Sequence, residues 1–495
     1  RQDKAAEALA SFERFLEQYP DSPHRAQAMF ERGQALVMLE RFDEAEAVFT
    51  AFMQEYSDTS FAPHALNHLG TIAQRAERHE DAAKYFAQVA ELAPSLDIVP
   101  ETMFQRGQSL LAARRLADAE AVLTQMLEAY PNAARAASAS ALRAIAVARQ
   151  GRQDDALTMI NGVEQKYMSE LDASLRGSLL YEKAWCQRGR DDLLGAESTY
   201  QQLIGIKDAG PLRLHAMLER AEIQAADERF GTAQEQLETL LQALKTEDNV
   251  PADLARQATY RIGVCEFRLG AFERSADRFD RYLQEYPQSD VELSARLLAG
   301  ESHFTLGQHK RAIEHLKVIT DGADDTEQYG PALLRLGECY AVLQYWPQSE
   351  DAYTQYLAKF PASEQWFQAQ FGIGWALDNR GEHALAIEAY RPVVDRHRGP
   401  TAARAQFQIG ECLFALERYS EAVRELLKVD ILYGYPEWSA ASLYEAGRCF
   451  QAMNDPVQAR RQYEQVQEKH ADTEWAKLAS QRLEEMASTT LPGRR

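Results

Sequence analysis

The sequence predicts an all-α solenoid of about twelve helix-turn-helix repeats. Three observations predict it: a small residue recurs at a nearly constant interval, an alanine or serine follows each at a fixed distance, and large apolar residues extend that spacing with helical periodicity. Residues that favour helix dominate the composition, and strand patterns are scarce. A chain of 495 residues suits such an array because each repeat contacts only its neighbours.

The first helix of each repeat carries a small residue, which we call the anchor. Successive anchors are 37 residues apart, except for steps of 40, 42 and 36. An aromatic or aliphatic residue commonly stands three positions earlier, which gives this helix an apolar stripe. The anchors are Gly33, Gly70, Gly107, Ala144, Ala184, Ala221, Gly263, Gly300, Gly337, Gly374, Gly410 and Gly447.

The second helix begins a few residues after the first one ends. Twelve positions beyond every anchor stands Ala or Ser, and large apolar residues follow four and seven positions later, as in Ala45, Phe49 and Phe52. These offsets describe one face of an α-helix, and small residues on both helices let their axes approach closely. Many second helices end in Tyr-Pro, as at Tyr130 and Pro131, where proline stops the helix.

These spacings resemble the tetratricopeptide repeat, which has Gly or Ala in its first helix, Ala twelve residues later, then an aromatic residue and a closing Pro. The resemblance covers about residues 3–486 and implies a right-handed superhelix whose first helices line a concave surface. The period of 37 exceeds the usual 34, and Met29, Leu66 and Met103 replace the usual Trp. This longer unit is similar to a bacterial subtype seen in the cell-division coordinator partnered with the Tol-Pal system and in a lipoprotein of the outer-membrane barrel-assembly machine.

The repeats suggest a division of the chain into three parts. Residues 1–20 match the second helix of a truncated preceding repeat, so we expect the array to start in mid-repeat and the chain to be an excised or processed segment. Residues 21–487 form one continuous solenoid, and the long link at 243–254 is the best candidate for a break. The polar residues 488–495 are expected to be a disordered tail.

Charge and composition exclude several classes of partner. The formal net charge of -21 repels phosphate, and no cluster of Lys and Arg offsets it, so nucleic acid is not expected. No stretch approaches the roughly 18 apolar residues of a membrane span. The sequence starting at Arg1 is not a signal peptide, so any targeting signal or lipid anchor would lie outside the segment.

No motif for catalysis, cofactor binding or metal binding stands out, and we expect a protein that is not an enzyme. The histidines are scattered without a repeated carboxylate partner; His309 and His315 fall on different helices of one repeat, but surface positions are favoured for all of them. Each cysteine stands two residues after an anchor, where other repeats have Ala or Ser, which favours a role in packing. The cysteines are Cys186, Cys265, Cys339, Cys412 and Cys449.

The resemblance places the residue after each anchor on the concave surface. The C-terminal half of this ladder is rich in acid and carries a Trp, which suits a basic or aromatic-rich protein or peptide. The alternative is that these residues are ordinary solvated helix faces. The candidate partner-binding residues are Gln34, Gln108, Trp185, Glu222, Glu301, Glu338, Trp375, Glu411 and Arg448. The ladder has no Asn or Lys, which disfavours the clamp that chaperone-binding repeats use for a C-terminal carboxylate.

The sequence therefore favours a protein-protein interaction scaffold in a bacterial envelope assembly. We expect a periplasmic or envelope-associated protein, with a cytoplasmic one as the alternative. Two other functions stay open: the regulatory or substrate-docking arm of a larger enzyme, and a structural array that assembles with itself. The sequence does not identify the partner or the oligomeric state.

Overall fold

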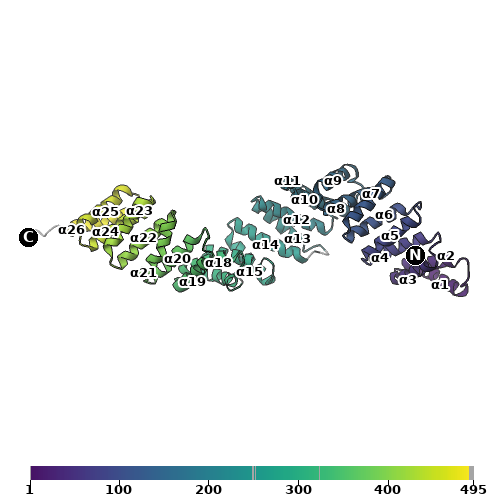
Figure 1. Ribbon diagram of the computed structural model, residues 1–495, viewed down its shortest axis with the longest axis horizontal. Helices are drawn as coiled ribbons and strands as arrows, with labels where there is room; N and C mark the ends of the chain where they lie inside the picture. The colour runs from purple at the N-terminus through teal and green to yellow at the C-terminus, as the bar shows by residue number, and fades with distance from the viewer. Residues whose placement is uncertain (1, 248–249, 251, 323, 490–495) are drawn as a thin grey trace, which may run out of the picture. The chain divides into compact units, whose positions relative to one another are not determined.

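The computed structural model describes residues 2–247, 250, 252–322 and 324–489, and within these residues it contains 26 α-helices and no strand. The chain divides into two compact units, Arg1–Ala258 and Thr259–Arg495. The boundary falls shortly after the link at 243–254; that this link is a break in the array stays a prediction. The helices, shown in Figure 1, confirm the predicted all-α solenoid.

Unit 1 contains thirteen complete helices in its described part, and α14 crosses into unit 2. Helix α1 packs against α2, and each later helix through α12 packs against the next. The bounds are α1 Gln2–Gln18, α2 Arg25–Met38, α3 Phe42–Glu55, α4 Ala62–Arg75, α5 His79–Leu92, α6 Val99–Ala112, α7 Leu116–Ala129, α8 Ala136–Arg149, α9 Gln153–Tyr167, α10 Ala173–Gly189, α11 Leu193–Ile204, α12 Pro211–Ala226, α13 Phe230–Ala243 and α14 Ala252–Arg268.

Unit 2 continues the same pattern from α15 to α26. Consecutive helices pack together, and α16, α18, α20, α22 and α24 also contact one another in sequence, so they form one layer. The bounds are α15 Phe272–Glu285, α16 Glu292–Thr305, α17 His309–Thr320, α18 Tyr329–Val342, α19 Trp346–Lys359, α20 Trp366–Asn379, α21 His383–Arg396, α22 Pro400–Ala415, α23 Tyr419–Leu432, α24 Pro436–Ala452, α25 Pro456–Lys469 and α26 Glu474–Thr489.

The predicted tail is only partly described. Residues 488 and 489 end α26 as helix, although the sequence suggests disorder from 488 onward. Residues 490–495 lie outside the described residues. None of the helices in the described part of the chain has the length and apolar character that a bilayer span requires.

The anchors lie where two helices approach most closely. Every anchor falls in an even-numbered helix from α2 to α24, and the residue twelve positions later falls in the following odd-numbered helix. A Cβ placed on Gly33 would lie 2.6 Å from the ring of Phe49, and one on Gly337 would lie 2.5 Å from the ring of Tyr353. The glycine thus leaves the space that the side chain of the second helix occupies.

The residues twelve positions after the anchors are all 0% exposed. Ten are Ala and two are Ser. Each Ser hydroxyl donates a hydrogen bond to the carbonyl of its anchor: Ser275 Oγ to Gly263 over 3.2 Å, and Ser349 Oγ to Gly337 over 2.8 Å. A buried hydroxyl therefore keeps a hydrogen bond at a position that otherwise takes only a methyl group.

The turn between the two helices has one conformation in every repeat. The residue seven positions after each anchor has a positive φ, for example 58° at Glu40 and 61° at Gln344. Four repeats place Gly there, and eight place a residue with a side chain. In the first repeat, the Arg41 amide donates to the Leu36 carbonyl over 3.0 Å, which closes the helix end in a left-handed cap.

The five cysteines are all buried and free. Burial raises the pKa of the Cys339 thiol to about 12 and that of Cys265 to about 11. Thiols in such surroundings are poor nucleophiles, and their burial agrees with the packing role predicted from their position.

We expect Gly70→Ala to lower the free energy of unfolding by about 1–3 kcal/mol, because the new methyl group would lie 2.5 Å from the ring of Phe86, which is 0% exposed and has no room to move. The control is Gly162→Ala in α9, where an added Cβ meets nothing within 4 Å. That substitution should raise the free energy of unfolding by up to about 1 kcal/mol, because Ala has a higher helix propensity than Gly. Urea unfolding followed by circular dichroism compares the two, and equal effects would contradict the close approach of the helices.

Candidate functional site

The candidate residues of unit 2 stand on five successive first helices: Glu301 on α16, Glu338 on α18, Trp375 on α20, Glu411 on α22 and Arg448 on α24. All five are partly buried. Glu338 and Trp375 line one cavity, whereas the other three lie beside it or further along the same layer.

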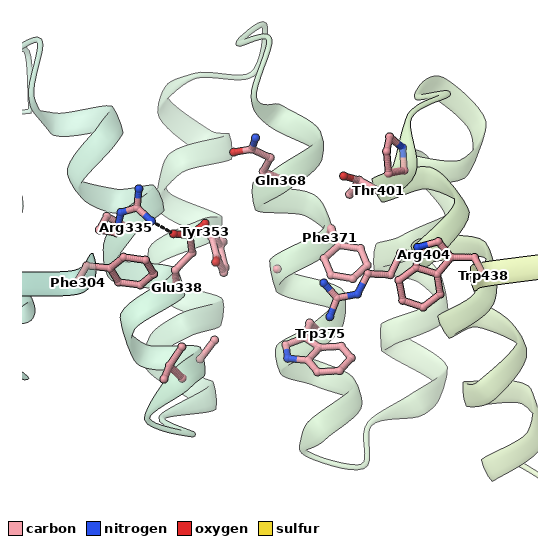
Figure 2. A pocket seen from close by; sticks show the side chains of 14 residues that line it. Phe304, Arg335, Glu338, Tyr353, Gln368, Phe371, Trp375, Thr401, Arg404 and Trp438 are labelled. Carbon is pink, nitrogen blue, oxygen red and sulfur yellow. Dashed lines mark hydrogen bonds and ion pairs between the residues drawn. The ribbon is translucent and has the colours of Figure 1, made fainter. Parts of the chain in front are cut away.

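This cavity has a volume of about 630 Å³ and is lined by residues of α16, α18, α19, α20, α22 and α24. Figure 2 shows its side chains from close by. We call it the aromatic cavity because five of its lining residues carry aromatic rings. Two arginines and one glutamate supply its charged groups. The residues used below are Phe304, Arg335, Glu338, Tyr353, Phe371, Trp375, Arg404 and Trp438.

Arg404 lies among the rings of this cavity. Its guanidinium carbon is 4.8 Å from the ring centre of Phe371, 4.9 Å from that of Trp375 and 6.0 Å from that of Trp438. Figure 2 shows these four side chains. Within the described residues no carboxylate pairs with it. Cation-π contacts of this kind contribute about 0.5–2 kcal/mol, and the guanidinium stays charged at any ordinary pH. In the described part of the chain, the cavity therefore presents a cation that is held by aromatic rings and has no acidic partner.

The second arginine, Arg335, forms ion pairs with two glutamates. It bonds Glu301 over 2.7 Å and also pairs with Glu338, while its guanidinium carbon lies 4.2 Å from the ring centre of Phe304. Two members of the predicted acidic ladder thus share one arginine, which offsets one of their two negative charges. A basic partner would have to displace Arg335 to reach them.

Glu411 and Glu445 form a second acidic pair, on α22 and α24. Burial and the neighbouring Glu445 raise the pKa of Glu411 to about 8, and Glu411 Oε1 has no hydrogen-bond partner among the described residues. Arg448 binds Glu445 over 2.6 Å and lies 4.8 Å from the ring centre of Phe414. Glu411 is therefore largely protonated at neutral pH and adds little negative charge to the groove.

The remaining candidates belong to unit 1. Trp185 on α10 is 46% exposed, and Glu222 on α12 lies 3.7 Å from Arg188. Gln34 on α2 approaches His68 over 3.4 Å and lines a cavity of about 600 Å³ beside α1. Gln108 on α6 is partly buried. Whether these four residues bind a partner stays a prediction.

Sequence reasoning missed the two arginines and Trp438. Only the residue after each anchor was followed, but positions three and seven earlier lie on the same helix face. Arg335 stands three residues before Glu338, and Arg404 stands seven before Glu411. Following the face over a further turn would have found both cations.

Two groups of side chains hold donor atoms close enough for a metal ion, each within 4.8 Å of one another: Asp280 with His303 and His315, and Asp378 with His383 and Cys412. The prediction that the histidines are surface residues is wrong for His303, which is 1% exposed. The prediction that His309 and His315 fall on different helices is also wrong, because both lie on α17. The ring of His303 is held by Asp280 at 3.3 Å and by Gln308 at 2.8 Å. Asp280 lies on α15, and Gln308 lies in the turn after α16. No local sequence motif predicts these contacts.

Family models described as tetratricopeptide repeat match most of the chain. One model matches residues 1–60, 104–169, 218–290 and 369–431. A second matches residues 331–363 and 441–473, and a third matches residues 63–96. The chain belongs to the tetratricopeptide-repeat family. Such repeats bind proteins or peptides, and this tetratricopeptide-repeat chain is accordingly an interaction scaffold.

The chain is also similar to several solved structures at low identity. A tetratricopeptide repeat protein from Parabacteroides merdae is 15% identical, with a TM-score of 0.36 over 57% of this chain and 98% of that one. YrrB, described as having an unusual peptide-binding site, is 17% identical, with a TM-score of 0.33 over 41% and 96%. The Cut9-Hcn1 structure is 14% identical, with a TM-score of 0.32 over 98% and 94%. No curated protein matches the sequence.

The raised pKa of Glu411 has a consequence for stability. The ordinary pKa of a glutamate is 4.5, and that of Glu411 in the folded protein is about 8. Between these two pH values, the folded protein keeps a proton on Glu411 that the unfolded chain releases. The free energy of unfolding should therefore fall as the pH rises from 4.5 to about 8. We expect Glu411→Gln to remove that fall and to stabilise unit 2 at pH 8 by on the order of 1 kcal/mol, or about 2–4 °C. Thermal melts from pH 4 to 8 measure the difference.

The control for Glu411→Gln is Glu425→Gln. Glu425 is partly buried, but Arg391, Gln406 and Lys428 bind its carboxylate and lower its pKa to about 2. Its contribution is present above the unfolded pKa and is lost as pH falls toward 2, so this substitution should destabilise at neutral pH. Melts in which both variants shift in the same direction at pH 8 would contradict the assignment of Glu411.

Proposed function

We propose that this chain is a scaffold that binds an extended segment of a partner protein along the first helices of unit 2, with one anchoring side chain in the aromatic cavity. The observation that carries the proposal is Arg404, a cation framed by Phe371, Trp375 and Trp438 without a carboxylate among the described residues. Partly desolvated Trp and Arg side chains are the types that contribute most binding energy at interfaces.

The charges of the cavity favour an aromatic and acidic segment. Arg335 is already paired with Glu301 and Glu338, whereas Arg404 contacts only rings and remains to pair with a carboxylate of the partner. A charge-assisted bond to that carboxylate, flanked by stacking on Trp375, would use both features of the site. Of the basic or aromatic-rich partners expected from the sequence, the aromatic-rich class is the one that this arrangement supports.

The cavity is also of a suitable size and depth. Its volume of about 630 Å³ falls within the usual range for sites that enclose a ligand group, and it opens toward the layer of first helices. Val342, which is 55% exposed, extends its apolar wall along α18. A peptide side chain can therefore enter the cavity while the peptide backbone follows the layer.

We expect peptide display on the folded chain to enrich sequences with an aromatic residue beside Asp or Glu. Arg404→Gln should weaken the enriched peptide at least tenfold, because the substitution removes the charge and keeps much of the side-chain stem. Trp375→Ala should weaken it as well. Fluorescence anisotropy with the labelled peptide measures both losses.

The control is Leu194→Ala, which removes an exposed apolar side chain on a second helix of unit 1. This variant should bind the peptide as the unchanged protein does. Enrichment of basic peptides, or equal affinity for the Arg404 and unchanged proteins, would refute the cavity as the anchor. Circular dichroism of each variant establishes that it is folded before its affinity is compared.

We further infer that the scaffold serves a bacterial envelope assembly and lies in the periplasm or on the envelope. Support comes from the repeat style, since the 37-residue unit closed by Tyr-Pro is similar to that of the Tol-Pal-associated coordinator and the barrel-assembly lipoprotein. Protease digestion of spheroplasts from the source cells tests it with an antibody to the chain. Digestion without lysis supports the inference, and protection until lysis contradicts it.

A further inference from the structure

We propose that Asp280, His303 and His315 form a binding site for one divalent transition-metal ion of the zinc class. The three residues lie on α15, α16 and α17, which pack consecutively within unit 2. An ion there would join these three helices through coordination bonds. This site is separate from the aromatic cavity and does not depend on the proposed function.

The donor atoms already converge. His315 Nε2 lies 2.9 Å from Asp280 Oδ1, and His303 Nε2 lies 3.3 Å from both carboxylate oxygens of Asp280. In a tetrahedral zinc site with bonds of about 2.0–2.2 Å, ligand atoms stand about 3.3–3.5 Å apart. The donor atoms of the three residues all lie within 4.8 Å of one another, so a modest adjustment brings them to these separations.

The rings need one adjustment to share an ion. The two imidazoles are parallel within 8°, with centres 5.5 Å apart. Because an ion lies in the plane of each ring that binds it, one ring must turn about its Cβ–Cγ bond. His315 is the freer of the two, since its side chain is 15% exposed and that of His303 is 1% exposed.

A supporting contact orients the buried histidine. His303 Nδ1 lies 2.8 Å from Gln308 Oε1 in the turn between α16 and α17. When Nδ1–H donates to this oxygen, the Nε2 lone pair is directed toward Asp280. Metal-binding histidines usually have such a partner on the second ring nitrogen, and losing it weakens metal affinity about 10–100-fold.

The donor set selects the class of ion. Two imidazole nitrogens and one carboxylate suit zinc and its first-row neighbours, whereas calcium and magnesium require oxygen ligands. Asp280 is 26% exposed, which gives solvent a path to the site and leaves room for water as a further ligand. The protein thus supplies three ligands, as in open zinc sites.

The other cluster is a satisfied hydrogen-bond network. Asp378 Oδ1 accepts from His383 Nδ1 over 2.8 Å and from Cys412 Sγ over 3.3 Å, while Oδ2 accepts from Gln408 over 3.3 Å. Burial beside Asp378 raises the pKa of the Cys412 thiol, and a thiol binds zinc only as thiolate. This cluster serves as the internal control.

We expect the full chain, freed of metal with a chelator, to bind one zinc ion in isothermal titration calorimetry. His315→Gln and Asp280→Asn should each weaken binding at least tenfold, and Gln308→Ala should weaken it about tenfold as a positioning residue. His315→Gln is the principal variant because its partly exposed ring is the least important of the three for packing. Its melting temperature without metal establishes that it is folded.

The matched control is His383→Gln, which should retain the affinity of the unchanged protein. Cobalt absorption near 500–700 nm, altered by His315→Gln and unaffected by His383→Gln, would add a direct sign of ligation. Absence of zinc binding by the unchanged protein would overturn the proposal. So would binding that survives His315→Gln and Asp280→Asn, or that is lost in His383→Gln.

Discussion

The contact between each glycine anchor and the large side chain sixteen residues later determines the rest of this structure. At Gly337, the ring of Tyr353 occupies the space that a Cβ would fill, and the same relation holds between Gly33 and Phe49. This contact sets the distance between the two helices of a repeat. Because the repeats share it, the first helices of unit 2 form a regular layer, and side chains at equivalent positions lie next to one another.

Packing also overrides local backbone preference at the turns. Eight repeats place a residue with a side chain where φ is positive, a conformation that costs such a residue about 1–2 kcal/mol. The buried helices on both sides hold the turn in place, as the 0% exposure of Ala45 and Phe49 beside Glu40 illustrates. Glycine at this position is therefore favourable but unnecessary, and the sequence shows it in only four repeats.

The sequence predicts the helices well because their signal is repeated. A single Ala or Gly is uninformative, but its recurrence with apolar partners at offsets of 12, 16 and 19 identifies both helices of each repeat. The site is less predictable because it depends on pairs between repeats. Glu301 appears as a free acid in the sequence, and only the structure brings Arg335, 34 residues away, into contact with it. The burial of His303 was not predicted for the same reason, since its partner Asp280 lies on another helix.

Helix α16 connects the two features that unit 2 presents. His303 and Phe304 are adjacent on it, and adjacent helical residues point about 100° apart. His303 accordingly faces Asp280 and His315 on the neighbouring helices, whereas Phe304 lies under Arg335 at the edge of the aromatic cavity. An ion held by α15, α16 and α17 would limit the motion of α16 and so of Phe304 and the Arg335 pair. Such an ion would act on partner binding by making one wall of the cavity rigid, which requires no contact between ion and partner.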